Sequence, residues 1–154
     1  NKRPDVRVLF DSTKIPNEII DTVTVAQASL AKPGGKEFAC AVIDAFYAVN
    51  DMLADPAKRD DALVAIGEKF SNLDLAGMKK VVQQTKFYGK PADGIEVLTS
   101  GQLKATMEKV VKFCVAQEIT ASQPKVGYGE RAVAPDANLR FDPSYIRLVA
   151  AQRK

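Results

Sequence analysis

A short polar cluster near the start of the chain carries residue types that could bind a small ligand. Asp11, Ser12 and Thr13 are consecutive, and Glu18 and Asp21 follow shortly afterwards. Two hydroxyl groups beside a carboxylate can hydrogen-bond a polar solute, and a carboxylate can balance an ammonium, amidinium or guanidinium group. The three consecutive residues are equally typical of a turn that bonds to its own backbone, and the other two of a solvated strand end. The spacing alone leaves both interpretations open.

Apolar segments flank this cluster on both sides. Val6–Phe10 is rich in β-branched and aromatic residues and predicts a strand. Ile19–Val25 predicts a second strand, without the clean alternation of a half-exposed one, as is typical when both faces are covered. Pro16 disfavours helix at Ile15 and separates the two segments. Because ligands of α/β proteins bind at strand ends, we expect the cluster to lie at the edge of a sheet.

The remainder of the chain reads as helical. Residues 36–53 carry a broad apolar face, which predicts a long and largely buried helix. Four further helices are predicted after the Asp-Pro pair at 55–56, the Asn-Leu-Asp at 72–74, Ser100, and the Asp-Pro pair at 142–143. Loops are predicted at 87–94 and 120–138. Since two strands do not make a stable parallel sheet, we expect this chain to be one part of a larger structure.

Composition narrows the class of protein. The 154 residues are 46% hydrophobic and 27% charged, as in a globular domain, and the net charge of +3 is too small to indicate nucleic acid. No apolar run approaches the length of a membrane span. No signal peptide is visible, so an exported form would be mature or trimmed.

The absence of histidine removes the commonest general base and metal ligand. No metal-ligand spacing or cofactor motif takes its place, so we expect no cofactor, no metal and no catalytic residue. Cys40 and Cys114 lie in apolar helical stretches, where buried free thiols are expected and a disulfide stays open. Phe87 with Tyr88, and the glycines around Tyr128, are interpreted as an apolar plug and a flexible loop.

The stretch "VRVLFDSTKIPNEIIDTVTVAQASLA" at 6–31 resembles the substrate-binding proteins of ABC importers for nitrate, sulfonates, taurine and thiamine precursors. That family usually has an apolar strand, Asp-Ser-Ser, Ile-Pro-Gly-x-Ile-x-Asp, and a second strand. This chain keeps Asp11, Ser12, Pro16 and Asp21, and departs at Thr13. It also has Asn17 where the family favours glycine. Asparagine is the residue that best replaces glycine in a left-handed conformation, so we expect the turn to survive.

The resemblance continues in "KEFACAVIDAFYAVNDML" at 36–53 and "LRFDPSY" at 139–145, and is weakest over 120–137. The nearest likeness is to the branch found beside urea carboxylase genes. The resemblance implies a helix-rich α/β chain, the C-terminal part of a two-lobed type II periplasmic binding fold that is incomplete as given. Residues 1–14 would end the second lobe and form a hinge strand, and 15–119 would supply the last strand and helices of the first. An irregular loop at 120–138 and a C-terminal helix at 139–154 would follow.

The function implied is a periplasmic, or extracellular and membrane-associated, solute-binding component that delivers its solute to a membrane permease. The missing N-terminal half, or a second copy of the chain, would complete the cleft. In that fold, Asp11, Ser12, Thr13, Glu18 and Asp21 would be ligand-binding residues. The solute stays open among nitrate, taurine, sulfonates, urea and guanidine-like molecules. Rival readings are a helical interaction module that docks a partner chain, and a thiamine-precursor synthesis enzyme of the same fold. The enzyme is disfavoured because its chemistry uses a histidine.

Overall fold

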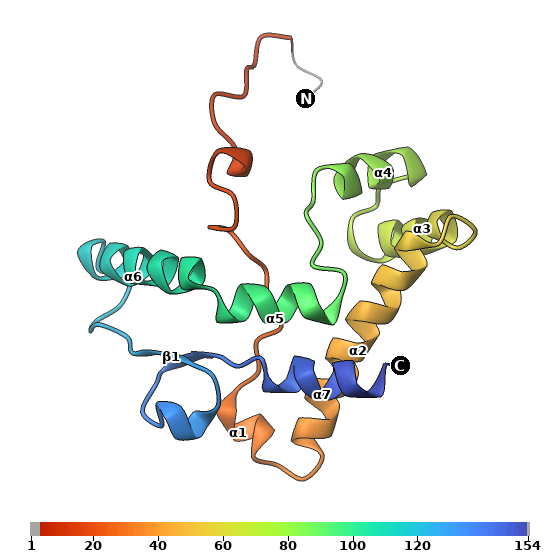
Figure 1. Cartoon of the computed structure of the whole chain (residues 1–154). Helices are drawn as coiled ribbons and strands as arrows, with labels where there is room; N and C mark the ends of the chain where they lie inside the picture. Colours follow the sequence, from red (N-terminus) through yellow and green to blue (C-terminus); the bar gives the residue numbers. More distant parts are fainter. Residues whose placement is uncertain (1–3, 154) are drawn as a thin grey trace.

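The computed structural model describes residues 4–153 and is a helix-rich α/β chain with a small parallel sheet. Figure 1 shows the order of its elements. The α-helices are α1 (Gln27–Leu30), α2 (Gly35–Ala54), α3 (Arg59–Phe70), α4 (Leu75–Gln83), α5 (Pro91–Thr99), α6 (Gly101–Ala116) and α7 (Ser144–Gln152). The strands are β1 (Val126–Tyr128) and β2 (Leu139–Phe141), and the short 3₁₀ helices are η1 (Ser12–Lys14) and η2 (Arg131–Val133).

Local capping signals set where several helices begin, as predicted. The Asp74 carboxylate accepts a hydrogen bond from the Gly77 amide at 2.8 Å and starts α4. The Ser100 hydroxyl accepts one from the Leu103 amide at 3.1 Å and starts α6. Each bond satisfies an amide that has no partner within its own helix. Helices α1 and α5 were not predicted, and α5 begins inside the expected loop at 87–94, with Pro91 in its first turn.

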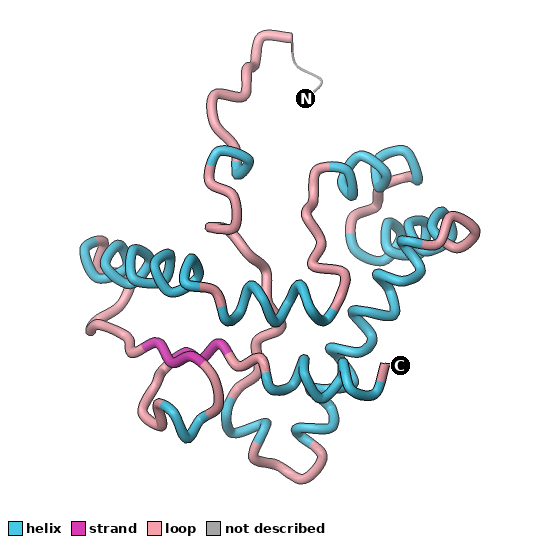
Figure 2. The backbone as a smooth tube through the Cα atoms, viewed as in Figure 1, coloured by secondary structure: helices cyan, strands magenta, loops and turns pink. Residues whose placement is uncertain are grey.

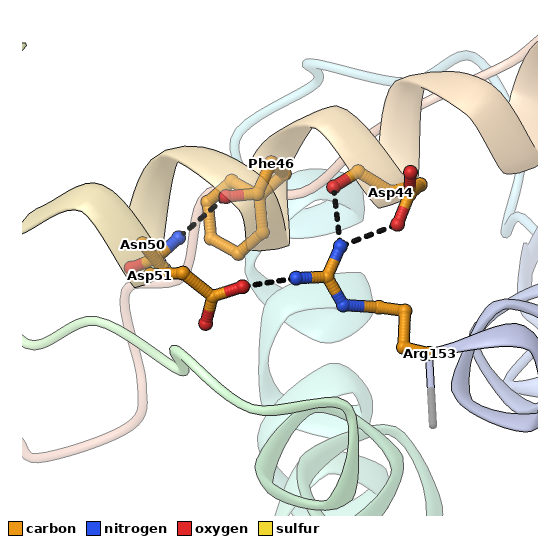
Figure 3. Close-up of polar contacts among 5 residues, drawn as sticks. All are labelled: Asp44, Phe46, Asn50, Asp51 and Arg153. Carbon is orange, nitrogen blue, oxygen red and sulfur yellow. Dashed lines mark hydrogen bonds and ion pairs between the residues drawn. The ribbon is translucent and has the colours of Figure 1, made fainter. Parts of the chain in front are cut away.

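The core lies where α2 meets α3 and α7, with α5 packed on α7 and α4 on α3. Leu63 of α3 and Val149 of α7 are the most deeply buried large side chains, and Tyr47 of α2 is also buried. Arg153, just after α7, extends to α2 (Figure 3). Its guanidinium donates to the Asp44 carbonyl oxygen at 3.1 Å, and to the carboxylates of Asp44 and Asp51.

The sheet is not where it was predicted. Neither Val6–Phe10 nor Ile19–Val25 forms a strand, whereas Val126–Tyr128 does, inside the stretch predicted as irregular. β1 and β2 pair in parallel, with Tyr128 opposite Phe141 and their rings stacked at 6.0 Å. The predicted strands fail because strand composition forms a strand only when another strand lies alongside, and none does so here.

The molecule is open rather than compact (Figures 1 and 2). Helix α6 extends to one side, and α3 and α4 to the other. Residues 4–26 are called here the N-terminal segment; its first part projects from the body, and its last part runs past α5 to α1. The accessible surface is 11,482 Å², about 1.5 times the ~7,600 Å² expected of a folded monomer of 16.7 kDa. Much apolar surface is therefore uncovered within this chain.

The prediction of a largely buried helix over 36–53 is wrong in that respect. Helix α2 covers the predicted range, but only Ala39 and Tyr47 are fully buried in it. Phe38 and Phe46 remain 69% and 42% exposed. The apolar face is as wide as the sequence indicates, but the described residues do not supply enough structure to cover it.

Candidate functional site

The first three residues of the polar cluster form one tight turn. The Asp11 carboxylate caps η1, and its Oδ1 accepts hydrogen bonds from both the backbone N–H (3.0 Å) and the side-chain hydroxyl of Thr13. The hydrogen bond from the Thr13 hydroxyl is the largest cause that lowers the pKa of the Asp11 carboxyl from its ordinary value of 3.8, and the hydrogen bond from the Thr13 backbone N–H is the second. The turn therefore holds a charged carboxylate in one orientation at neutral pH.

Part of this turn stays available to another molecule. Asp11, Ser12 and Thr13 are all exposed. Both hydrogen bonds from Thr13 reach Oδ1 of Asp11, which leaves Oδ2 without a partner among residues 4–153. The Ser12 side chain likewise has no hydrogen-bond partner within that range. A carboxylate oxygen and a hydroxyl group thus lie side by side on a short, locally ordered stretch.

The other two predicted residues are not joined to that turn. Glu18 is half-buried and forms an ion pair with Lys109 of α6 at 3.4 Å. Asp21 is exposed and has no hydrogen bond or ion pair with the described part of the chain. No hydrogen bond within residues 4–153 connects either carboxylate to Asp11, Ser12 or Thr13. The structure therefore brings three of the five predicted residues together, and Glu18 instead anchors the segment to a helix.

A junction centred on Asn17 attaches the N-terminal segment to the helical body. Asn17 has a left-handed backbone (φ 62°), as its replacement of glycine predicted. Its Oδ1 accepts hydrogen bonds from the Tyr88 hydroxyl at 2.7 Å and the Lys86 ammonium at 3.1 Å. The Gln102 amide donates to the carbonyl oxygen of Pro16 at 3.1 Å. We call these five residues the Asn17 junction.

A small recess adjoins the Asn17 junction. It has a volume of about 80 Å³ and is lined by Asn17, Ile20, Glu96, Val97, Ser100, Gln102 and Leu103. Since one water molecule occupies about 30 Å³ of liquid, the recess is large enough for a few waters or one very small solute. Its lining includes residues with amide, hydroxyl and carboxylate groups, but none of the five predicted site residues.

The Asn17 junction is not predicted by the sequence pattern. The sequence predicts that Tyr88 is part of an apolar plug, yet the hydroxyl of the half-buried Tyr88 donates a hydrogen bond to Asn17, 71 positions earlier. The Lys86 ammonium also lies over the Tyr88 ring, 5.1 Å from its centroid. The one usable signal was an asparagine at a position that favours φ > 0. Its side-chain partners lie too far along the chain to be found by spacing.

The carboxylates, cysteines and helices of residues 4–153 add three further observations. No group of three or more Cys, Asp or Glu side chains is arranged there to hold a metal ion. Cys40 and Cys114 are both free, as expected, although each is half-buried rather than fully buried. Burial, and secondarily the charge of Glu37, raises the pKa of the Cys40 thiol. Among the described helices, none combines the length and apolar character needed to cross a membrane.

Comparison with known proteins places this chain in no group. No protein-family model matches it. No curated protein and no solved structure matches it either.

Proposed function

We propose that this chain is part of the solute-binding component of an ABC importer. In this proposal it has the type II periplasmic binding fold, works in the periplasm or at the outer face of the membrane, and delivers a small polar solute to a permease. The chain would act as a receptor and not as an enzyme. The observation that carries the proposal is the exposed, charged turn at Asp11–Thr13, held on a segment that projects from the helical body.

The chemistry of the turn suits a small solute with hydrogen-bond donors. Oδ2 of Asp11 and the Ser12 hydroxyl have no partner within residues 4–153, and Thr13 already orients the carboxylate. A group held in place before binding loses little further freedom when the solute arrives. Urea, guanidine-like and ammonium-bearing solutes fit a carboxylate better than nitrate does, because a bare anion would be repelled by it.

The mechanism we propose is closure of two lobes around the solute. The Asn17 junction would fix the base of the N-terminal segment, and residues 4–15 would carry the turn toward a second lobe. Only a solute with higher affinity for the closed form can drive closure. The assignment of residues 1–14 and 15–119 to two lobes belongs to this proposal. A separate N-terminal half or a second copy would complete the cleft, so this chain alone should bind solute weakly.

A second candidate function is an interaction module that docks a partner chain. The large exposed surface favours it, with apolar side chains uncovered on α2 and α6, such as Phe38 and Phe113. The two functions differ in one measurable property. A receptor part binds a small solute at the Asp11–Thr13 turn, whereas a pure interaction module binds none.

The test is a titration of the ¹⁵N-labelled chain, followed by amide chemical shifts. The probes are urea, guanidinium, taurine and nitrate, each at up to tens of millimolar and at constant ionic strength. We expect urea or guanidinium to shift amides of residues 11–21, with saturation in the millimolar range. Unsaturated shifts spread over the whole chain, or no shift with any probe, would contradict the proposal.

A further inference from the structure

We propose that residues Arg7–Asp11 pair antiparallel with the same residues of a second copy of this chain, in a register centred on Leu9. This inference rests on the exposed apolar segment and on charge complementarity. It does not depend on which solute the chain binds, but a solute at the Asp11–Thr13 turn and Arg7 of the second copy would compete for Oδ2 of Asp11.

The segment has the side chains of a strand, but no strand formed by residues 4–153 pairs with it. Val6, Val8, Leu9 and Phe10 are 44%, 68%, 93% and 63% exposed. No backbone hydrogen bond joins Val6–Phe10 to another described residue. A row of unpaired N–H and C=O groups beside apolar side chains is a template for pairing with another chain.

The chain as a whole exposes more surface than a stable dimer needs. The accessible area exceeds that expected of a folded monomer of this mass by several thousand Å². A standard interface needs only about 800 Å² from each partner. The strand pair would be the centre of the contact.

The order of residues around Leu9 is complementary to itself. A two-fold antiparallel pair centred on Leu9 places Val8 opposite Phe10 and Arg7 opposite Asp11, each twice. Side chains alternate between faces, so one face carries the apolar pairs while the other carries Leu9 and the charge pairs. Aromatic–aliphatic and opposite-charge pairs are both stabilising when directly opposite across antiparallel strands.

Both charged groups are free to make this contact. Arg7 forms no ion pair with residues 4–153, and Oδ2 of Asp11 has no partner there. The Asp11 backbone is already extended (φ −148°, ψ 176°), as a strand requires. A register centred on Val6 would also give Arg7 an acidic neighbour, Asp5. That register brings Pro4 into the ladder, where proline has no N–H to donate.

The test is sedimentation equilibrium of the full chain over a wide concentration range. We expect a monomer–dimer equilibrium whose dissociation constant rises about tenfold or more in Arg7→Asp, because both cross-strand pairs become repulsive. Asp11→Arg should weaken the dimer similarly. The double variant Arg7→Asp/Asp11→Arg should restore most of the affinity, since it exchanges the two charges.

The control is Lys32→Asp, which changes net charge as Arg7→Asp does, at an exposed position in the turn after α1. It should leave the dimer intact, and circular dichroism should show equal helix content in all variants. A chain that stays monomeric overturns the proposal. So does a dimer that loses equal affinity in Lys32→Asp, or one that the double variant does not rescue. A complex with a separate polypeptide in place of self-association would also overturn it.

Discussion

The Tyr88 hydroxyl donates a hydrogen bond to Oδ1 of Asn17 at 2.7 Å, and so connects the N-terminal segment to the loop between α4 and α5. From residue 11 to residue 25, the polar contacts to the helical body all come from Pro16, Asn17 and Glu18. This short stretch therefore sets the direction in which the Asp11–Thr13 turn is presented.

Tyr88→Phe should loosen the N-terminal segment without unfolding the helices. The loss of one hydrogen bond at a half-buried site costs about 1 kcal/mol, which raises the open population about fivefold. Tryptic cleavage after the exposed Lys14 should accelerate accordingly. Tyr145→Phe is the control, because the Tyr145 hydroxyl bonds to no residue of the described part. Equal cleavage rates in the two variants would show that the Tyr88 bond does not hold the segment.

Gly94→Ala should destabilise the packing of α5 against Tyr47 of α2 and Ile146 of α7. An added Cβ would lie 2.7 Å from the Tyr47 hydroxyl and 3.3 Å from Cδ1 of Ile146. We expect a loss of about 1–3 kcal/mol in the free energy of unfolding, measured with urea. Tyr47→Phe in the same chain should recover part of it, because it removes the atom that the Cβ meets.

Gly101→Ala is the matched control for that substitution. Nothing lies within 4 Å of the Cβ it would add at the start of α6, and its backbone is helical. It should be neutral or stabilise the chain by up to about 1 kcal/mol, since alanine favours helix over glycine. A loss of stability in Gly101→Ala equal to that in Gly94→Ala would refute the contact with Tyr47.

Arg153→Ala should lower the melting temperature by detaching α7 from α2. The guanidinium bonds to Asp44 and Asp51, and lies 5.9 Å from the centroid of the Tyr47 ring (Figure 3). Arg153→Lys should fall between the wild type and Arg153→Ala, because an ammonium keeps the charge but cannot bond to both carboxylates in the same geometry. Arg147→Ala, an exposed position on the same helix, should change the melting temperature little. A melting temperature unchanged in Arg153→Ala would contradict this role.

Thr13→Val should raise the pKa of the Asp11 carboxyl. The Thr13 hydroxyl bond is the main cause of the lowered pKa, so its loss should move the value back toward 3.8. Because the folded pKa is lowered, Asp11 stabilises the turn above its ordinary pKa, and this stabilisation is lost as the pH falls through the lowered value. Carbon-13 NMR of the Asp11 carboxyl, followed as a function of pH, measures this pKa in the wild type and in the variant. Thr13→Ser, which keeps the hydroxyl, should titrate like the wild type. Identical titration of the valine variant would exclude the hydroxyl as the cause.

The elements that the sequence predicts well are those set by neighbouring residues. Asp74, Ser100 and Asp142 each bond to an amide two or three positions later, so the signal and its target lie in one short window. Strand pairing is non-local. Val6–Phe10 has the composition of a strand but no partner strand in the described part of the chain, whereas the short, glycine-containing Val126–Tyr128 pairs with β2.

The candidate site also has one part that is set by neighbouring residues and one part that is set by residues far along the chain. The Asp11–Thr13 turn follows from adjacent residues and was among the alternatives that the sequence left open. The Asn17 junction depends on contacts across 69 to 86 positions, which no single sequence pattern reports. Burial was overestimated along α2, because a wide apolar face indicates that something should cover it but not which chain supplies the cover.

The most direct test of the proposed receptor function is the solute affinity of Asp11→Asn compared with that of Asp55→Asn. Asp55 is the matched control because its Oδ1 also accepts a backbone N–H two residues later, from Ala57 at 2.9 Å, and its pKa is lowered too. With urea or guanidinium, whichever the chain binds, Asp11→Asn should weaken binding about tenfold, since it removes a charged acceptor. Asp55→Asn should bind like the wild type. Equal affinity in the two variants, or no solute binding by the wild type at any attainable concentration, would contradict a solute-binding role for the Asp11–Thr13 turn.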